Sequence, residues 1–169
     1  MNLHHSLSPK LVSRSEATPI IDETRRRGGV IVFTNGCFDL LHAGHVVYLQ
    51  KAKALGDMLV VGINTDESVR QIKGPRRPIN PLEERALVLS GLSSVDLIIP
   101  FEEPTPYSLI ALIQPDVLVK GEDWEDSQIV GRDLVEGREG KVVRLPVKEG
   151  ISTTEIIRRI LEAYGRPGR

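Results

Sequence analysis

At 169 residues the chain has room for one globular domain with a buried core, so we look for a single active site. Its 22 Lys and Arg residues against 23 Asp and Glu residues give no strong basic field, which argues against nucleic acid as a partner. The longest apolar runs, such as residues 58–63, are too short to cross a bilayer, and the amino terminus lacks the layout of a signal peptide, so we expect no membrane association.

The amino-terminal residues 1–17 have no clear pattern and are predicted to be a loose N-terminal extension. A single domain is expected over residues 18–169, because no repeat, low-complexity tract or linker divides the chain. A helix is expected over residues 19–27, since Thr18 and Pro19 suit an N-cap and a first turn and three arginines end the segment.

Short runs rich in Val and Ile recur along the rest of the chain. They predict strands, each buried on both faces, at residues 30–33, 58–63, 95–100, 116–119 and 141–145. Segments with helical spacing lie between or after them, at residues 45–55, 82–92, 107–113 and 155–164. This alternation predicts an α/β fold, a Rossmann-like parallel sheet flanked by helices on both sides.

The richest motif follows the first predicted strand and reads TNGCFDLLHAGH from Thr34 to His45. In a parallel α/β sheet, ligands bind beyond the carboxyl ends of the strands, so we expect the active site here. Gly36 is expected to permit a tight turn. Gly44 is expected to let a ligand approach the backbone at the helix start, where free N–H groups and the positive dipole end favour phosphate.

His42 and His45 are three residues apart, so a helix that begins near His42 would direct both imidazoles at one ligand. Nucleotidyl transfer needs no covalent intermediate, because positioned donors and Mg²⁺ stabilise the charge that develops on the transferred group. Zinc ligation and incidental surface residues are the alternatives, although neither an HExxH pattern nor a cysteine cluster is present. Cys37 is interpreted as a small buried residue rather than a nucleophile, and as the only cysteine it favours a cytoplasmic location.

The segment GISTTEI offers a second group of polar residues. Ser152 or Thr153 is a ready N-cap, and Glu155 stands at the capping-box position. Taken alone, this pattern favours a purely structural helix cap. Its hydroxyls and free N–H groups would nevertheless make a second phosphate site, which a nucleoside triphosphate needs.

Two further segments are expected near the same edge of the sheet. Lys120 ends a predicted strand and offers a point charge to phosphate, while Asp123 could accept a hydrogen bond from a base or ribose hydroxyl. We expect residues 120–124, with the segment before Ile151, to shape the base pocket. The basic loop at residues 73–78 is an ordinary solvated surface unless its position makes it a phosphate clamp.

With these motifs, GCFDLLHAGH and GISTTEI, the chain resembles the cytidylyltransferase-like family of HxGH nucleotidyltransferases, a fold of the HIGH nucleotidyltransferase type. It is similar to the glycerol-3-phosphate cytidylyltransferases and more similar to the adenylyltransferase domains of the bifunctional heptose enzymes, which make ADP-heptose for lipopolysaccharide. The nearer resemblance rests also on INTDESV, RPINPLEER and PDVLVKGEDW, and it covers residues 16–164. No kinase half is included, so a stand-alone adenylyltransferase is expected.

The resemblance implies a role for each matching position. The catalytic residues would be His42, His45 and Lys73. The nucleotide would be bound by Asn35, Gly36, Cys37, Phe38, Gly44, Lys120, Gly121, Asp123, Ser152, Thr153 and Thr154. The phosphate of the second substrate would be bound by Asp39, Arg76, Arg77 and Arg85. Mg²⁺ would accompany the triphosphate without a metal site of the protein's own, and a homodimer is the usual assembly.

The implied reaction is transfer of AMP from ATP to the anomeric phosphate of a heptose 1-phosphate, with release of pyrophosphate. One alternative is CTP-dependent transfer to glycerol 3-phosphate or a similar alcohol phosphate. Another is a nucleotide-binding regulatory module without turnover, against which the intact histidine pair argues. Val147 departs from the cytidylyltransferase pattern, which has an arginine there, so either Lys148 replaces that charge or the nucleotide sits differently.

Overall fold

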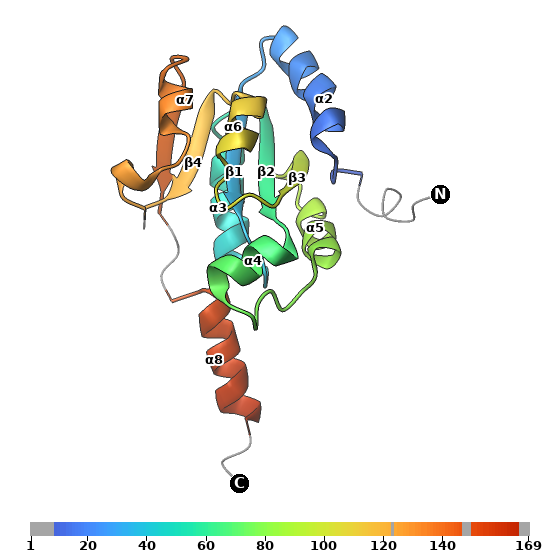
Figure 1. Ribbon diagram of the computed structural model, residues 1–169, viewed down its shortest axis with the longest axis vertical. Coiled ribbons are helices and arrows are strands. Elements are labelled where there is room, and N and C mark those ends of the chain that lie inside the picture. The colour runs from blue at the N-terminus through green and yellow to red at the C-terminus, as the bar shows by residue number, and fades with distance from the viewer. Residues whose placement is uncertain (1–8, 123, 147–149, 166–169) are drawn as a thin grey trace.

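The computed structural model describes residues 9–122, 124–146 and 150–165, and its centre is a five-stranded parallel sheet (Figure 1). The strands are β1 (Ile31–Gly36), β2 (Met58–Asn64), β3 (Leu97–Phe101), β4 (Val117–Gly121) and β5 (Lys141–Leu145). They lie in the order β3-β2-β1-β4-β5, and all four neighbouring pairs are parallel. The predicted Rossmann-like α/β fold is therefore confirmed, with its switch point between β1 and β4.

Helices connect the strands as the sequence predicts. They are α2 (Arg14–Arg26), α3 (Ala43–Lys53), α4 (Asp66–Lys73), α5 (Leu82–Ser90), α6 (Tyr107–Ile113), α7 (Arg132–Glu136) and α8 (Thr153–Tyr164), with the short 3₁₀ turn η1 (Asp126–Gln128). The bounds of α6 agree with the prediction, whereas η1 and α7 were not predicted. The two have 3 and 5 residues, fewer than two helical turns, so no apolar spacing can repeat within them.

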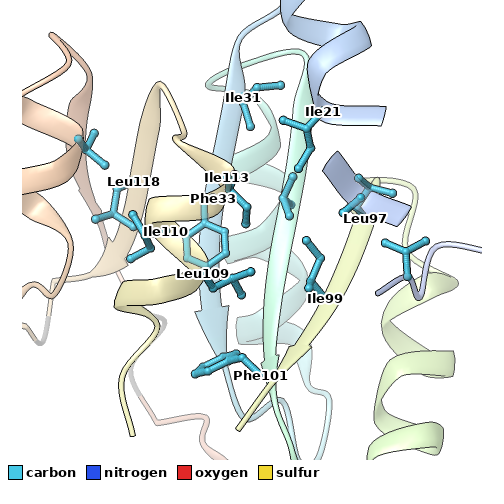
Figure 2. Packing of buried hydrophobic residues seen from close by; sticks show 14 of the residues in the cluster. Ile21, Ile31, Phe33, Leu97, Ile99, Phe101, Leu109, Ile110, Ile113 and Leu118 are labelled. Atoms are coloured by element: carbon cyan, nitrogen blue, oxygen red, sulfur yellow. The ribbon is translucent and has the colours of Figure 1, made fainter. Parts of the chain in front are cut away.

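Two apolar clusters cover the two faces of the sheet. Helices α2, α6 and α7 pack on one face around Phe33, and Figure 2 shows Ile110 and Ile113 of α6 lying against it. Helices α3 and α5 pack on the other face, where Val32 is buried with Leu49. Neighbouring residues of β1 thus enter opposite cores, which is why the inner strands read as continuous apolar runs.

Strand β5 departs from the prediction that every strand is buried on both faces. Lys141 and Arg144 are exposed, and Val142 and Val143 are only partly buried. The reason is position, because β5 lies at the edge of the sheet and has one neighbouring strand, β4.

The amino-terminal segment also differs from the prediction. Helix α2 begins at Arg14 rather than at residue 19, and Ser13 caps it with a reciprocal capping box to Glu16. Val12 is 8% exposed and belongs to the core, and the N–H of Val12 donates to the carbonyl of Ile98 at 3.0 Å. Residues 10–17 were expected to belong to a loose extension, but residues 10–12 lie along the outer edge of β3 and residues 14–17 form the start of α2, where Ala17 is buried.

Helix α8 extends away from the sheet on the side of the strands' carboxyl ends (Figure 1). None of its residues is buried. Across the described residues, no helix combines the length and the apolar character needed to cross a membrane.

Candidate active site

A cavity of about 620 Å³ opens where β1, β2, β3 and β4 end. It brings together most of the residues to which the sequence assigns a site role. They are Asn35, Gly36, Cys37, Phe38, Asp39, His42, Gly44, His45, Lys73, Arg77, Lys120, Gly121, Ser152, Thr153 and Thr154. Arg76 and Arg85 do not line the cavity, and Asp123, Val147 and Lys148 lie outside the described residues.

The two histidines form a stacked pair at the start of α3. Their ring centroids are 3.8 Å apart and the ring planes are inclined by 20°. His42 is the N-cap residue, and its Nδ1 accepts a long hydrogen bond of 3.4 Å from the N–H of His45. A neutral His42 with an accepting Nδ1 carries its proton on Nε2, so it is a hydrogen-bond donor at that atom.

Gly44 makes this stack possible. A Cβ at this position would lie 3.0 Å from Nδ1 and from Cε1 of His42, closer than an ordinary contact. The sequence suggested that Gly44 admits a ligand to the backbone, whereas the structure fills that space with the imidazole of His42. Any side chain at residue 44 would therefore push His42 away from His45.

Burial favours the neutral form of both histidines in the free protein. The Nδ1 atom of His45 is buried and has no hydrogen-bond partner among the described residues. Burial, with a smaller contribution from the neighbouring His42, lowers the pKa of His45 to about 4. Burial also lowers the pKa of His42. An anion bound in the cavity beside the ring edges would favour protonation, so the pair is suited to meet phosphate.

The turn before the histidines is held by an unusual backbone conformation. Phe38 has a φ of 47°, in the left-handed region that few residues with a side chain adopt. Its ring lies beside Gly36, where a Cβ would come within 3.1 Å of it, and its centroid is 5.2 Å from that of His45. Gly36 therefore serves close packing, while the left-handed residue of the turn is Phe38.

Asp39 and Arg85, expected at the substrate phosphate, are both engaged within the protein. The Asp39 carboxylate pairs with Arg77 and accepts from the N–H groups of Ile79 at 2.7 Å and Asn80 at 3.1 Å. The side chain of Arg85 is 0% exposed and pairs with Asp66. Arg76, by contrast, is exposed at the surface.

Lys120 reaches the cavity from the end of β4. Its ammonium group donates to the side-chain oxygen of Asn35 and lies 5.7 Å from the ring centroid of Trp124. Burial lowers the pKa of Lys120 to about 8, so most of the lysine is charged at pH 7. An incoming anion would find this charge already oriented by β1 and by the indole.

The start of α8 lies next to the start of α3. The Ile151 carbonyl oxygen is 3.9 Å from the position a Cβ on Gly44 would take. Ser152 caps α8 and accepts from the N–H of Glu155 at 3.1 Å, as the capping pattern predicts. The positive ends of two helix dipoles therefore meet at one cavity, which favours a ligand with several phosphates.

Several cavity residues were not identified from the sequence. They are Tyr48, Asn64, Ile72, Phe101, Pro104, Thr105, Pro106, Gln128 and Val130. Asn64 and Phe101 end β2 and β3, so the rule that ligands bind at strand ends could have found them. Pro104 to Pro106 carry no such signal, because only the crossover of the chain into α6 brings them over the cavity.

Residues 33–159 match the family described as Cytidylyltransferase-like. The chain belongs to the cytidylyltransferase-like family. It is 50% identical over 163 residues to the Bifunctional protein HldE of Syntrophotalea carbinolica, a match covering 95% of this chain and 33% of that protein. The HldE of Wolinella succinogenes is 56% identical over 151 residues, 89% of this chain and 31% of that protein. The chain thus spans about a third of the length of these two relatives.

Solved structures agree with the fold. The lipopolysaccharide core biosynthesis protein of Thermoplasma volcanium has a TM-score of 0.63 and 28% identity, covering 72% of this chain and all of that one. A pantoate-beta-alanine ligase of Francisella tularensis has a TM-score of 0.58 at 17% identity, covering 90% of this chain and 77% of that one. The second match concerns the fold alone.

Proposed function

We propose that the chain is an adenylyltransferase that moves AMP from ATP to a heptose 1-phosphate, forming ADP-heptose and pyrophosphate for the lipopolysaccharide core. The observation that carries the chemistry is the neutral His42–His45 stack at the start of α3, facing a cavity that the start of α8 also lines. Relatives named HldE, at 50% and 56% identity, and the resemblance to the heptose enzymes support the choice of substrates.

In the proposed reaction an oxygen of the acceptor's phosphate attacks the α-phosphorus of ATP in line. The new oxygen–phosphorus bond forms as the bond from the α-phosphorus to the bridging oxygen breaks, and pyrophosphate leaves with that electron pair. The imidazole N–H groups of His42 and His45 donate to the α-phosphate oxygens, where negative charge grows. Because donors fixed in a stacked pair at the start of a helix need little reorganisation, they stabilise the transition state more than the bound substrate.

The remaining groups bind and orient the two anions. Lys120 and the hydroxyls of Ser152 and Thr153 would hold the nucleotide, with Lys73 beside the transferred group. Arg77 would face the acceptor phosphate while Asp39 fixes its guanidinium. Each of these residues lines the cavity, which is what supports the assignment.

Mg²⁺ fits this site as a companion of the triphosphate. Within the described ranges no three His, Cys, Asp or Glu side chains gather as a metal site, and the Asp39 carboxylate is already engaged by Arg77 and two N–H groups. The cavity therefore suits an ion whose ligands are mainly phosphate oxygens and water. When bound, Mg²⁺ would neutralise charge on the departing pyrophosphate.

A pyrophosphate-release assay across ATP, CTP and a panel of sugar and polyol phosphates tests the proposal. We expect release only when ATP and a heptose 1-phosphate are both present. Release with CTP and glycerol 3-phosphate instead would favour the alternative cytidylyltransferase. Nucleotide binding without release for any acceptor would favour a regulatory module.

The proposal extends to a cytoplasmic homodimer. The proposed donor, ATP, is a cytoplasmic metabolite. Helix α8 exposes Ile160, Leu161 and Tyr164, the last at 85%, and an exposed apolar surface of this kind is typical of an association site. Light scattering on the purified chain should give twice the monomer mass, and a monomer mass at all concentrations would remove this part of the proposal.

A further inference from the structure

The side chain of Arg85 connects three segments around the cavity without entering it. Its Nη1 donates to the carbonyl of Cys37 at 2.6 Å, and its Nε to that of Asn80 at 3.0 Å. Its Nη2 donates to the carbonyl of Asn64 at 2.9 Å and to the carboxylate of Asp66 at 2.7 Å. The guanidinium thus fixes the turn after β1, the carboxyl end of β2 and the loop before α5 in one arrangement.

A second set of bonds joins the same turn to the same loop. The carboxylate of Asp39 accepts from the N–H groups of Ile79 and Asn80, and the backbone carbonyl of Asp39 accepts from Nδ2 of Asn80 at 3.2 Å. Cys37 and Asp39 are therefore both anchored to residues 79–85. Phe38, between them, is the residue with the left-handed backbone.

Anchoring on both sides explains how Phe38 keeps a φ of 47°. That conformation is strained for a residue with a side chain and persists where the surroundings fix it. The anchored turn holds the Phe38 ring 5.2 Å from the ring of His45, whose other neighbour is His42 at 3.8 Å. Moving the turn would move one wall of the pocket that orients His45.

We propose that Arg85 is a positioning residue, which sets the orientation of His45 through the Cys37–Asp39 turn and the ring of Phe38, and does not bind substrate phosphate. The inference rests on the proposed nucleotidyl transfer for its kinetic consequence. The arrangement on which it depends can be measured without turnover.

The first test is Arg85→Lys, which keeps the positive charge and removes the planar fork that reaches three carbonyl groups at once. We expect kcat to fall by at least about tenfold, the scale of a displaced catalytic group, while KM for the acceptor phosphate and KM for the nucleotide each change by less than about threefold. A phosphate ligand would give the opposite pattern, a raised KM with kcat recovered at saturation, and that pattern would overturn the proposal. Asn80→Ala, which removes a single bond to the turn, should lower kcat less and in the same direction.

The second test combines Arg85→Lys with His45→Ala. If Arg85 acts through His45, Arg85→Lys should change kcat by less than about twofold in the His45→Ala background, because the ring that Arg85 orients is no longer present. An undiminished tenfold effect in that background would contradict the proposal. Asp96→Asn is the matched control, since Asp96 accepts from Lys53 and from the N–H of Leu59 at the amino end of β2, away from the cavity. It should lower the melting temperature and leave kcat unchanged.

Imidazole NMR on the intact chain provides the readout that requires no substrate. The resonances of His45 report the ring currents of His42 and Phe38, so they should shift in folded Arg85→Lys and stay in place in Asp96→Asn. Unshifted His45 resonances in a folded Arg85→Lys variant would reduce Arg85 to a stabilising core residue. If the wild-type chain releases no pyrophosphate with any acceptor, the proposed function fails, and these spectra still decide whether Arg85 orients His45.

Discussion

Two helix starts meet at the cavity, and they are held in different ways. The start of α3 follows the central strand β1, and the turn before it is bonded to Arg85 and Asn80 inside the protein. The start of α8 is capped by Ser152, and no residue of that helix is buried. The histidines assigned to the chemical step thus lie in the most firmly packed part of the site. The hydroxyls assigned to phosphate binding lie on α8, which packs little against the rest of the protein. This division predicts kcat effects from the first region and affinity effects from the second.

The largest effect is expected from the histidine pair. Replacing His42 or His45 by Ala should lower kcat by about two orders of magnitude or more, the scale of losing one donor to the transition state. The cost in stability should be small for His45→Ala, because the Nδ1 atom of His45 has no partner among the described residues. It should be about 1 kcal/mol for His42→Ala, which also removes the N-cap of α3. Steady-state kinetics and thermal melting of both variants check this. Near-normal turnover by either folded variant would remove the histidines from the chemical step.

Much of this site could be predicted from the sequence because it depends on local patterns. The strand and helix alternation placed TNGCFDLLHAGH at the end of β1, and the spacing of His42 and His45 placed both rings on one side of a helix start. The role of Arg85 could not be predicted in the same way. Its burial depends on contacts with Cys37 and Asn64, which are 48 and 21 residues away, and in sequence it is an ordinary helix arginine.

The start of α2 shows a different kind of error. Thr18 and Pro19 resemble a helix start, but Ser13 and Glu16 form the capping box, and Pro19 lies inside the helix. Both patterns were present in the sequence. The contact of Val12 with the edge of β3 favours the earlier start, and that contact is non-local.

Substrate choice is the next largest expected effect and concerns the whole cavity. ATP should be preferred over CTP, and a heptose 1-phosphate over glycerol 3-phosphate, each by at least about tenfold in kcat/KM, because a pocket shaped for one ligand leaves polar groups unpaired around another. Measuring kcat/KM for the four pairings of nucleotide and acceptor checks both preferences. Faster turnover of CTP with glycerol 3-phosphate would change the substrates and leave the chemistry in place.

Lys120 belongs to the firmly packed region but is assigned to nucleotide binding. Its substitution therefore tests whether a residue of that region can change affinity rather than kcat. Lys120→Met should weaken ATP binding by about tenfold, since it removes a buried charge that an anion meets and keeps a long apolar side chain. The free energy of unfolding should change less than the affinity for ATP, because burial disfavours the charge of Lys120 in the folded protein. Calorimetric titration of ATP against both proteins provides the comparison.

The same lysine gives a pH dependence with a defined sign. Its pKa of about 8 means that the charge disappears as pH rises through 8, so ATP affinity should fall between pH 7 and 9 in the wild type. The affinity of Lys120→Met should stay flat over this range. Because the folded protein holds fewer protons on Lys120 than the unfolded chain between about 8 and 10.5, the wild type should gain stability relative to the variant as pH rises there. If the wild type and Lys120→Met differed in ATP affinity and in stability by the same amount at every pH, Lys120 would keep its proton over the whole range.

The smallest effect is expected at the start of α8. Ser152→Ala removes the hydroxyl that caps the helix and lines the cavity, and loss of such a cap costs about 1 kcal/mol of helix stability. Because α8 buries no residue, this cost should melt the helix start locally and leave the sheet intact. KM for ATP should therefore rise by about threefold to tenfold, with kcat at saturation changed by less than about twofold.

Ser152→Asp is the informative companion, since aspartate also caps a helix but places a negative charge where phosphate is expected. We expect the aspartate variant to restore the helix and to bind ATP more weakly than the alanine variant. If Ser152→Asp bound ATP as well as the wild type does, the start of α8 would be a structural cap, and the phosphates would be held by the α3 side of the cavity alone.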